Sequence, residues 1–131
     1  MFLTNECDYA MRVVRVLSDL EQRTVKTICD CEHVPLHFAY KILKKLENAG
    51  IVSSRRGALG GYQLSRKLCD INLYDIVNAV DENLFINDCL QLDHECPHNN
   101  KVKSCNIHQE LRRIQNILVD ALKENTMNVL T

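Results

Sequence analysis

Residues 24–64 read TVKTICDCEHVPLHFAYKILKKLENAGIVSSRRGALGGYQL, and this stretch sets the expected fold. Its first part predicts a short helix over 25–32. Pro35 then suits the first turn of a second helix, which ends before the capping glycine Gly50. Two short helices joined by a tight turn, the second with basic residues on its outer face, form the helix-turn-helix pattern.

A β-hairpin is expected directly after these helices. The β-forming residues predict strands over 51–54 and 62–64, joined by a turn that holds two arginines and three glycines. The glycines permit the positive φ angles that such a tip needs. A generic surface hairpin would explain the glycines but not paired arginines after a basic helix. We therefore interpret the hairpin as a wing that contacts DNA.

Helical spacing divides the second helix of the pattern into two faces. Four apolar residues are expected to face inward: Phe38, Ile42, Leu43 and Leu46. Lys45 is expected to project outward with the polar residues. The residues expected to contact double-stranded DNA are His37, Tyr40, Lys41, Lys44, Arg55 and Arg56. Among these, His37 and Tyr40 are candidates for base contacts, whereas Lys41 and the arginines suit phosphates or the minor groove.

The charge distribution favours DNA binding although the net charge is −1. Residues 1–68 carry 11 Lys and Arg against 7 Asp and Glu, whereas residues 69–131 carry 5 against 10. Between positions 40 and 67 there are seven basic residues and one acid, Glu47. A local basic patch matters more for phosphate binding than the average over the chain.

Two further helices are expected to complete the domain. The first runs over 5–19, capped by Thr4, with a buried stripe made of Tyr9, Val13, Val16, Leu17 and Leu20. The other runs over 73–80, capped by Asn72, with Leu73, Ile76, Val77 and Val80 buried. Cys29 is expected in the core, and Asp8 is expected to be exposed near the start of the first helix.

A long amphipathic helix of about 17 residues ends the pattern. Its apolar face consists of Ile107, Leu111, Ile114, Leu118, Ala121 and Leu122. A small winged domain cannot bury so long a stripe, so we expect the helix to pack on a second copy of the chain. The sequence leaves open whether the tail over 126–130 packs back or stays loose.

The loop before this helix, residues 89–108, reads CLQLDHECPHNNKVKSCNIH. Six residues separate its first two cysteines, eight separate the next two, and a histidine follows three positions after the last. Packing alone cannot order a segment so poor in apolar residues, and clustered thiolates favour zinc or an iron–sulfur centre. A disulfide pair, or a loop with incidental cysteines, is the alternative interpretation.

The seven cysteines of the 131 residues also indicate a compartment. The chain shows no signal peptide and no apolar run near the ~18 residues of a membrane span. Thiols stay reduced in the cytoplasm, so an odd cysteine count there indicates metal or redox chemistry in place of a disulfide scaffold. A thiol redox enzyme is disfavoured because no Cys-x-x-Cys occurs, and we expect neither an enzyme nor a small-molecule substrate.

Several motifs together resemble one family of winged-helix regulators. They are Asp8-Tyr9-Ala10-Met11-Arg12, Val34-Pro35, the stretch Ala49 to Ser54, Arg56 to Leu64, Ile71-Asn72-Leu73, Ile76 to Asp81 and the three-cysteine loop. The family includes the iron–sulfur regulator IscR, the nitric-oxide sensor NsrR and the cysteine-metabolism regulator CymR. The resemblance covers nearly the whole chain. It implies a homodimeric bacterial transcription factor, usually a repressor.

The resemblance also implies an iron–sulfur cluster on Cys89, Cys96 and Cys105. The CymR branch lacks these cysteines. His108 matches the fourth ligand of IscR-like proteins and is favoured, Asp8 matches that of NsrR-like proteins, and His33 matches that of a further member. The spacings are longer than in IscR and NsrR, which leaves [2Fe–2S] and [4Fe–4S] both open.

The expected fold class is mostly α with a small β-hairpin wing: a winged helix-turn-helix with a long C-terminal dimerisation helix. We expect a DNA-binding domain over 1–80, a cluster-binding loop over 81–108, and the dimerisation helix and tail over 109–131. The expected function is operator binding controlled by a cluster that senses iron or cluster status, oxidants or nitric oxide. The alternatives are a zinc-stabilised or thiol-redox DNA-binding regulator of the same fold, or a cysteine-metabolism regulator without a cluster.

Overall fold

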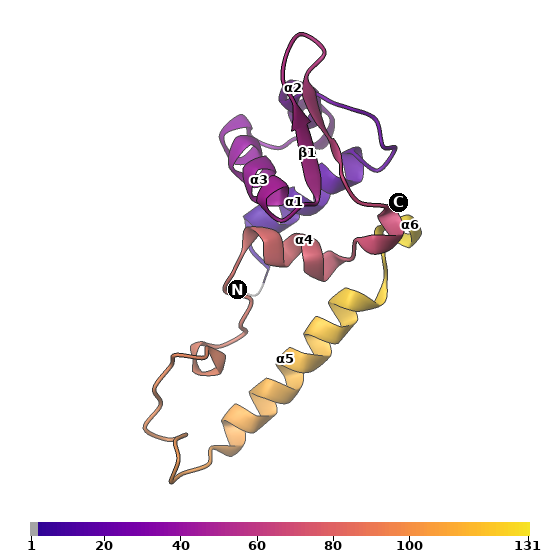
Figure 1. Ribbon diagram of the computed structural model, residues 1–131. Helices are drawn as coiled ribbons and strands as arrows, with labels where there is room; N and C mark the ends of the chain where they lie inside the picture. The colour runs from indigo at the N-terminus through magenta and orange to yellow at the C-terminus, as the bar shows by residue number, and fades with distance from the viewer. Residues whose placement is uncertain (1–2) are drawn as a thin grey trace.

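A computed structural model describes residues 3–131 and confirms the winged helix-turn-helix prediction. Helices α1–α4 and the hairpin form one body, from which α5 extends as an arm with the cysteine loop at its far end (Figure 1). The elements are α1 (Asn5–Val16), α2 (Val25–Glu32), α3 (Leu36–Asn48), β1 (Val52–Arg55), β2 (Gly61–Leu64), the 3₁₀ turn η1 (Leu68–Asp70), α4 (Leu73–Val80), the 3₁₀ turn η2 (Asp88–Leu90), α5 (Asn106–Glu124) and α6 (Met127–Leu130).

The core lies between α1, α3 and α4, where the apolar stripes of the three helices meet. Its fully buried side chains include Val13, Ile42 and Ile76, one from each helix. Local signals fix the helix starts: the Thr4 hydroxyl accepts from the N–H of Cys7, and Asn72 and Asp75 form a reciprocal capping box. The capping residues therefore determine where these helices begin, and the helical spacing of the apolar residues determines which face of each helix meets the core.

Two expectations for this core were wrong. Helix α1 ends at Val16, and Leu20 has a φ of 65° and a 58% exposed side chain. The chain tightens after Val16 through a hydrogen bond from the N–H of Ser18 to the carbonyl of Arg15, so Leu20 leaves the buried stripe. Cys29, expected in the core, is half-buried and is not part of the core cluster, whereas Phe38 is half-buried and packs against the core as expected.

The wing is a two-stranded antiparallel hairpin that pairs Val52 with Leu64 and Arg55 with Gly61. Arg23 extends it, because its N–H and C=O both pair with Tyr62 at 2.9 and 2.7 Å. The tip requires glycine: a Cβ on Gly60 would lie 2.4 Å from the carbonyl oxygen of Arg55. The hairpin is thus anchored to the chain that enters α2.

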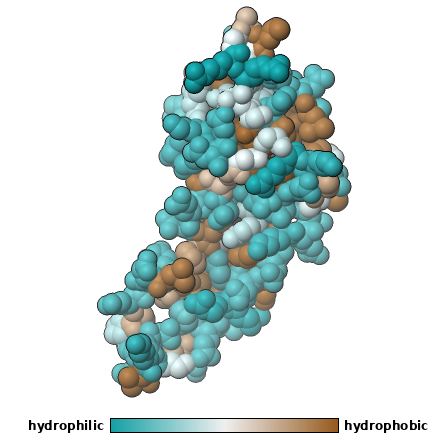
Figure 2. All heavy atoms as spheres, viewed as in Figure 1, coloured by the Kyte–Doolittle hydropathy of each residue, from teal (hydrophilic) through white to brown (hydrophobic). Residues whose placement is uncertain are grey.

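Helix α5 carries the expected apolar stripe, one side of which is covered by the rest of the chain. Leu111 and Leu122 are half-buried against their own chain. The other side is exposed and consists of Ile107, Ile114, Ile117, Leu118 and Ala121. Figure 2 shows apolar surface interspersed with hydrophilic surface along this arm. Within residues 3–131 no helix is long and apolar enough to cross a bilayer.

The tail packs back onto the winged domain, which settles the question that the sequence left open. Met127 is 3% exposed, and its N–H donates to the carbonyl of Ile71 at 2.7 Å. Thr126 also forms a bridge with Asn72. The C-terminal end of α5 is therefore tied to the start of α4.

Candidate DNA interface and metal centre

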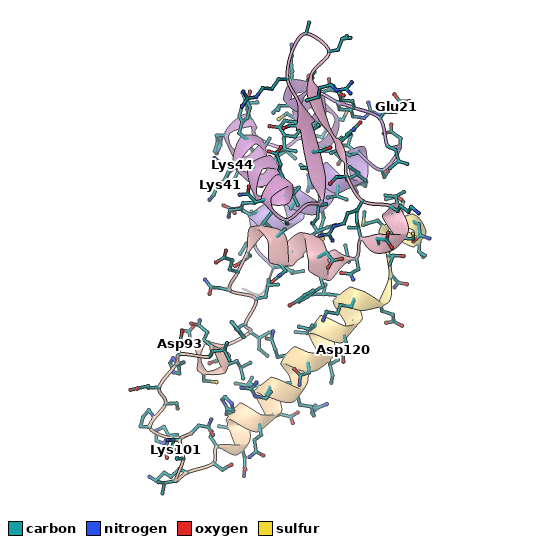
Figure 3. The ribbon with its side chains drawn as sticks, in the orientation of Figure 1. Glu21, Lys41, Lys44, Asp93, Lys101 and Asp120 are labelled. Atoms are coloured by element: carbon teal, nitrogen blue, oxygen red, sulfur yellow. The ribbon has the colours of Figure 1, made fainter. Side chains whose placement is uncertain are left out.

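The outer face of α3 carries the residues expected to contact DNA. Because Ala39, Ile42 and Leu43 face the core, the side chains of His37, Tyr40, Lys41 and Lys44 are exposed, as expected. Figure 3 shows Lys41 and Lys44 projecting from the same side of the helix. The arrangement presents hydrogen-bonding and cationic groups along one exposed helix face, as a recognition helix requires.

Arg55 and Arg56 lie at the exposed end of the wing. Neither arginine forms an ion pair with any residue in the described range 3–131. The side-chain amide of Gln22 donates to the carbonyl of Leu59, which ties the tip to the segment before α2. Two cationic side chains are thus held on a braced hairpin and remain available for phosphate.

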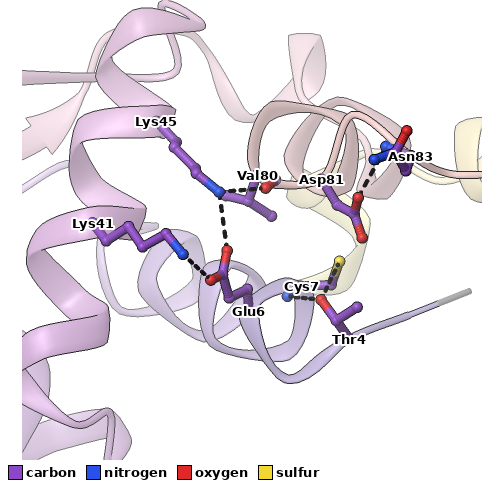
Figure 4. Close-up of polar contacts among 8 residues, drawn as sticks. All are labelled: Thr4, Glu6, Cys7, Lys41, Lys45, Val80, Asp81 and Asn83. Atoms are coloured by element: carbon purple, nitrogen blue, oxygen red, sulfur yellow. Dashed lines mark hydrogen bonds and ion pairs between the residues drawn. The ribbon is translucent and has the colours of Figure 1, made fainter. Parts of the chain in front are cut away.

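Lys45 does not project into solvent, which corrects the expectation from the sequence. Its ammonium donates to the carboxylate of Glu6 at 3.0 Å and to the carbonyl of Val80 at 2.8 Å (Figure 4). Lys41 contacts the other oxygen of Glu6 at 2.5 Å. The hydrogen bond from Lys41, helped by Lys45, lowers the pKa of Glu6 below its ordinary value, although burial opposes the shift. Glu6 therefore joins α1 to α3, and Lys45 joins α3 to the end of α4.

The three loop cysteines lie on different local structures. Cys89 is in η2, and Cys105 is the N-terminal cap residue of α5. Cys96 lies in a turn and forms a backbone bridge with Asn99. All three are half-buried free thiols. Among residues 3–131, no three His, Cys, Asp or Glu side chains lie close enough together to hold a metal ion.

His108 lies one turn into α5 from Cys105. Its Nε2 is 3.3 Å from the Arg112 guanidinium, and its Nδ1 is buried without a hydrogen-bond partner in the described part of the chain. A buried ring nitrogen without a partner is costly, so this atom has capacity for a further ligand. The spacing of three residues places Cys105 and His108 on one face of the helix.

The other two candidate ligands lie away from this loop. Asp8 pairs with Arg12 at 2.9 Å and lines a hollow beside Met127 and Leu130, next to the end of α5 opposite the cysteines. His33 is exposed and ends α2 with a φ of 53°, next to Glu32, which contacts Arg12 and Arg15 of α1. Of these three candidate fourth ligands, His108 is the one that lies next to a loop cysteine within residues 3–131.

The remaining cysteines have ordinary environments. Cys7 is fully buried in the core. Burial raises the pKa of the half-buried Cys29 thiol, and the nearby Asp30 adds to the shift, so the thiol stays protonated. Cys31 and Cys69 are exposed.

Comparison with known proteins identifies the family. The family model Rrf2, described as an iron-dependent transcriptional regulator, matches residues 3–131. The chain belongs to the Rrf2 family. Members of this family are transcriptional regulators that bind DNA, so the chain is such a regulator and not an enzyme.

Individual relatives agree with this Rrf2 assignment. The chain is 29% identical to protein aau3 of Rhizobium meliloti over 99% of its own length and 84% of the relative's. It is 32% identical to the regulator NsrR of Geobacillus kaustophilus over 68% of its length and 63% of that protein's. The solved structure of CymR from B. subtilis superposes with a TM-score of 0.73 at 22% identity, covering 98% and 94% of the two chains. That of T. potens IscR gives 0.71 at 20% identity, covering 96% and 82%.

Proposed function

We propose that this Rrf2-family chain is a homodimeric repressor whose operator affinity is controlled by an iron–sulfur cluster. The ligands would be Cys89, Cys96, Cys105 and His108. The observation that carries the proposal is the buried, unpartnered Nδ1 of His108, one helical turn from the half-buried thiol of Cys105. The name of the family model, an iron-dependent regulator, supports the same chemistry.

The donor set fits such a group. Three thiols and one imidazole are suitable ligands for an iron–sulfur cluster, and all three thiols are free and half-buried. When bound, the cluster supplies the folding free energy that the loop lacks. Cys89 and Cys105 are already attached to η2 and α5, so the turn around Cys96 has the most freedom to close the site.

Dimer formation is supported by the exposed apolar face of α5. Ile107, Ile114, Ile117 and Leu118 are 72%, 37%, 53% and 37% exposed on a single helix. Packing this row against the same row of a second subunit removes both rows from water. In a two-fold symmetric dimer, the same surface forms both sides of the interface. Two recognition helices would then read the two half-sites of a DNA operator.

The cysteine loop connects to the DNA-binding surface by a short path. Residues 81–88 separate Cys89 from Val80, whose carbonyl accepts the hydrogen bond from Lys45 of α3. A displacement of Cys89 therefore acts on the end of α4 and, through Lys45 and Glu6, on α3 and α1. This path would convert a change in the loop into a change in how α3 is held.

Two experiments test the ligand set. The parent protein, purified without oxygen, should absorb visibly and contain iron and acid-labile sulfide, and should bind operator DNA with an affinity at least about tenfold different from the cluster-free form, or about 1.4 kcal/mol. Cys89→Ser, Cys96→Ser and Cys105→Ser should each abolish or greatly weaken cluster binding. A protein that holds zinc without iron, or no metal, would contradict the proposal and favour a zinc-stabilised regulator or one without a cluster.

The fourth ligand is tested by a matched pair of variants. His108→Ala should alter the visible spectrum and shorten the lifetime of the cluster in air, whereas Asp8→Ala should leave both unchanged. The reverse result would assign the role to Asp8, which could reach only the loop of a second subunit. If both variants match the parent, His33 or a small exogenous ligand fills the position.

A further inference from the structure

Gln115 is a buried polar residue whose role the proposed function does not use. It lies in the middle of α5 and is 9% exposed. Its Nε2 donates to the carbonyl of Leu84 at 2.5 Å, and its Oε1 accepts from the N–H of Ile86 at 2.9 Å. One amide side chain thus satisfies two backbone groups in the segment that leads to the first loop cysteine.

These two hydrogen bonds fix where that segment runs. A buried amide without partners is costly, and so are the unpaired backbone groups of Leu84 and Ile86. The segment therefore cannot slide along α5 without losing both bonds. An apolar side chain at position 115 would hold the segment by contact area alone, without this register.

The two hydrogen bonds of Gln115, here called the clamp, lie close to Cys89 along the chain. Only two residues separate Ile86 from Cys89, and Asn87 accepts a hydrogen bond from the N–H of Cys89 at 3.1 Å. Leu84 and Leu90 are 5% and 3% exposed, so both ends of the segment are anchored. The turn η2, which contains Cys89, packs against α5.

The clamp also places this segment on a particular face of the helix. Gln115 follows His108 by seven residues, which is close to two full turns, so the two side chains lie on the same face of α5. We propose that Gln115 is the positioning residue that holds Cys89 against the face of α5 carrying His108. The inference rests on the proposed function, because it assigns Gln115 to the assembly of that ligand set.

The test compares Gln115→Met with Gln115→Glu and a control, Asn116→Met, whose side chain is exposed on the same helix. In the cluster-free protein, Gln115→Met should speed amide exchange over 86–90 by about tenfold while α1–α3 keep the parent's rates. After anaerobic reconstitution, its cluster should have a changed visible spectrum and a lifetime in air shortened about fivefold or more. Gln115→Glu keeps the acceptor for Ile86 and should fall between the parent and Gln115→Met, and Asn116→Met should match the parent.

A parent-like spectrum and lifetime in Gln115→Met, even with faster exchange, would overturn the inference, because Gln115 would then only pack the helix. If circular dichroism shows that Gln115→Met does not fold, Gln115→Glu replaces it in the test. A parent-like cluster in Gln115→Glu would then overturn the inference. If the parent itself takes up no iron and sulfide, the proposed function fails first and this inference fails with it.

Discussion

The winged domain and the cysteine loop are held by different kinds of interaction. In the domain, Ile42, Leu43 and Ile76 are fully buried, and apolar stripes from three helices meet. In the loop over 91–104, Leu92 and Val102 are 94% and 92% exposed. Within the described residues 3–131, each hydrogen bond that this loop forms joins two positions no more than six residues apart in the sequence. The domain can fold by burying apolar surface, whereas we propose that the loop depends on a bound group to order it.

A pair of alanine substitutions tests this contrast and should give the largest effect. Ile42→Ala removes a fully buried side chain from α3 and should lower the free energy of unfolding by about 2–5 kcal/mol. Leu92→Ala, in the loop, should change it by no more than about 0.5 kcal/mol. Urea unfolding of the cluster-free protein measures both. Equal losses would mean that the loop contributes to the core.

Tyr40 tests whether the exposed face of α3 reads bases. Its side chain is 56% exposed, so Tyr40→Ala should leave unfolding nearly unchanged. The variant should lose about 1–3 kcal/mol of preference for the operator over altered sequences. Competition binding against a set of single-base operator variants measures this preference. A uniform loss across all duplexes would place Tyr40 on the DNA backbone.

Arg56 tests the wing and should have a smaller effect. Arg56→Ala should weaken binding to every duplex by about 1 kcal/mol and reduce the slope of affinity against salt by about one counterion. Arg113→Ala is the control, because Arg113 is exposed on α5 and paired with Glu110. Measurements at several salt concentrations separate the two variants. An unchanged affinity and slope for Arg56→Ala would remove the wing from the DNA interface.

Glu6→Gln should give the smallest effect, and the size of its effect depends on pH. The pKa of Glu6 in the folded protein is lowered, so its ion pairs stabilise the fold above the carboxyl's ordinary pKa and are lost as pH falls through the lowered value. Glu6→Gln should therefore cost at most about 1 kcal/mol near neutral pH and nothing in strong acid. Unfolding between pH 2 and pH 7, with the exposed Glu82→Gln as control, measures this. A loss that is independent of pH would contradict the ion-pair role.

Sequence patterns predicted the winged domain because local signals and apolar spacing agree there. Thr4 and Asn72 cap helices where expected, and Gly60 lies at a tip that admits no Cβ. One error arose where a tertiary contact decides the position of a side chain. Lys45 points to Val80 and Glu6, both far from it in sequence, and no periodicity reveals such partners.

The candidate site was predictable in composition but not in geometry. Cysteine spacing indicates which residues are candidate ligands, but spacing alone does not give the shape of a loop without apolar anchors. Gln115 was missed because a glutamine on a helix is usually exposed. The available signal was its position on the apolar face, four residues after Leu111 and seven before Leu122.

Amide hydrogen exchange over residues 91–104 tests most directly whether a cluster orders the loop. The measurement compares the parent, reconstituted anaerobically with iron and sulfide, with the same protein after the cluster is removed. We expect the loop amides to exchange about tenfold or more slowly with the cluster bound, while the amides of α3 keep the same rates. Equally fast exchange in both forms, after iron and sulfide uptake has been measured, would contradict the central claim.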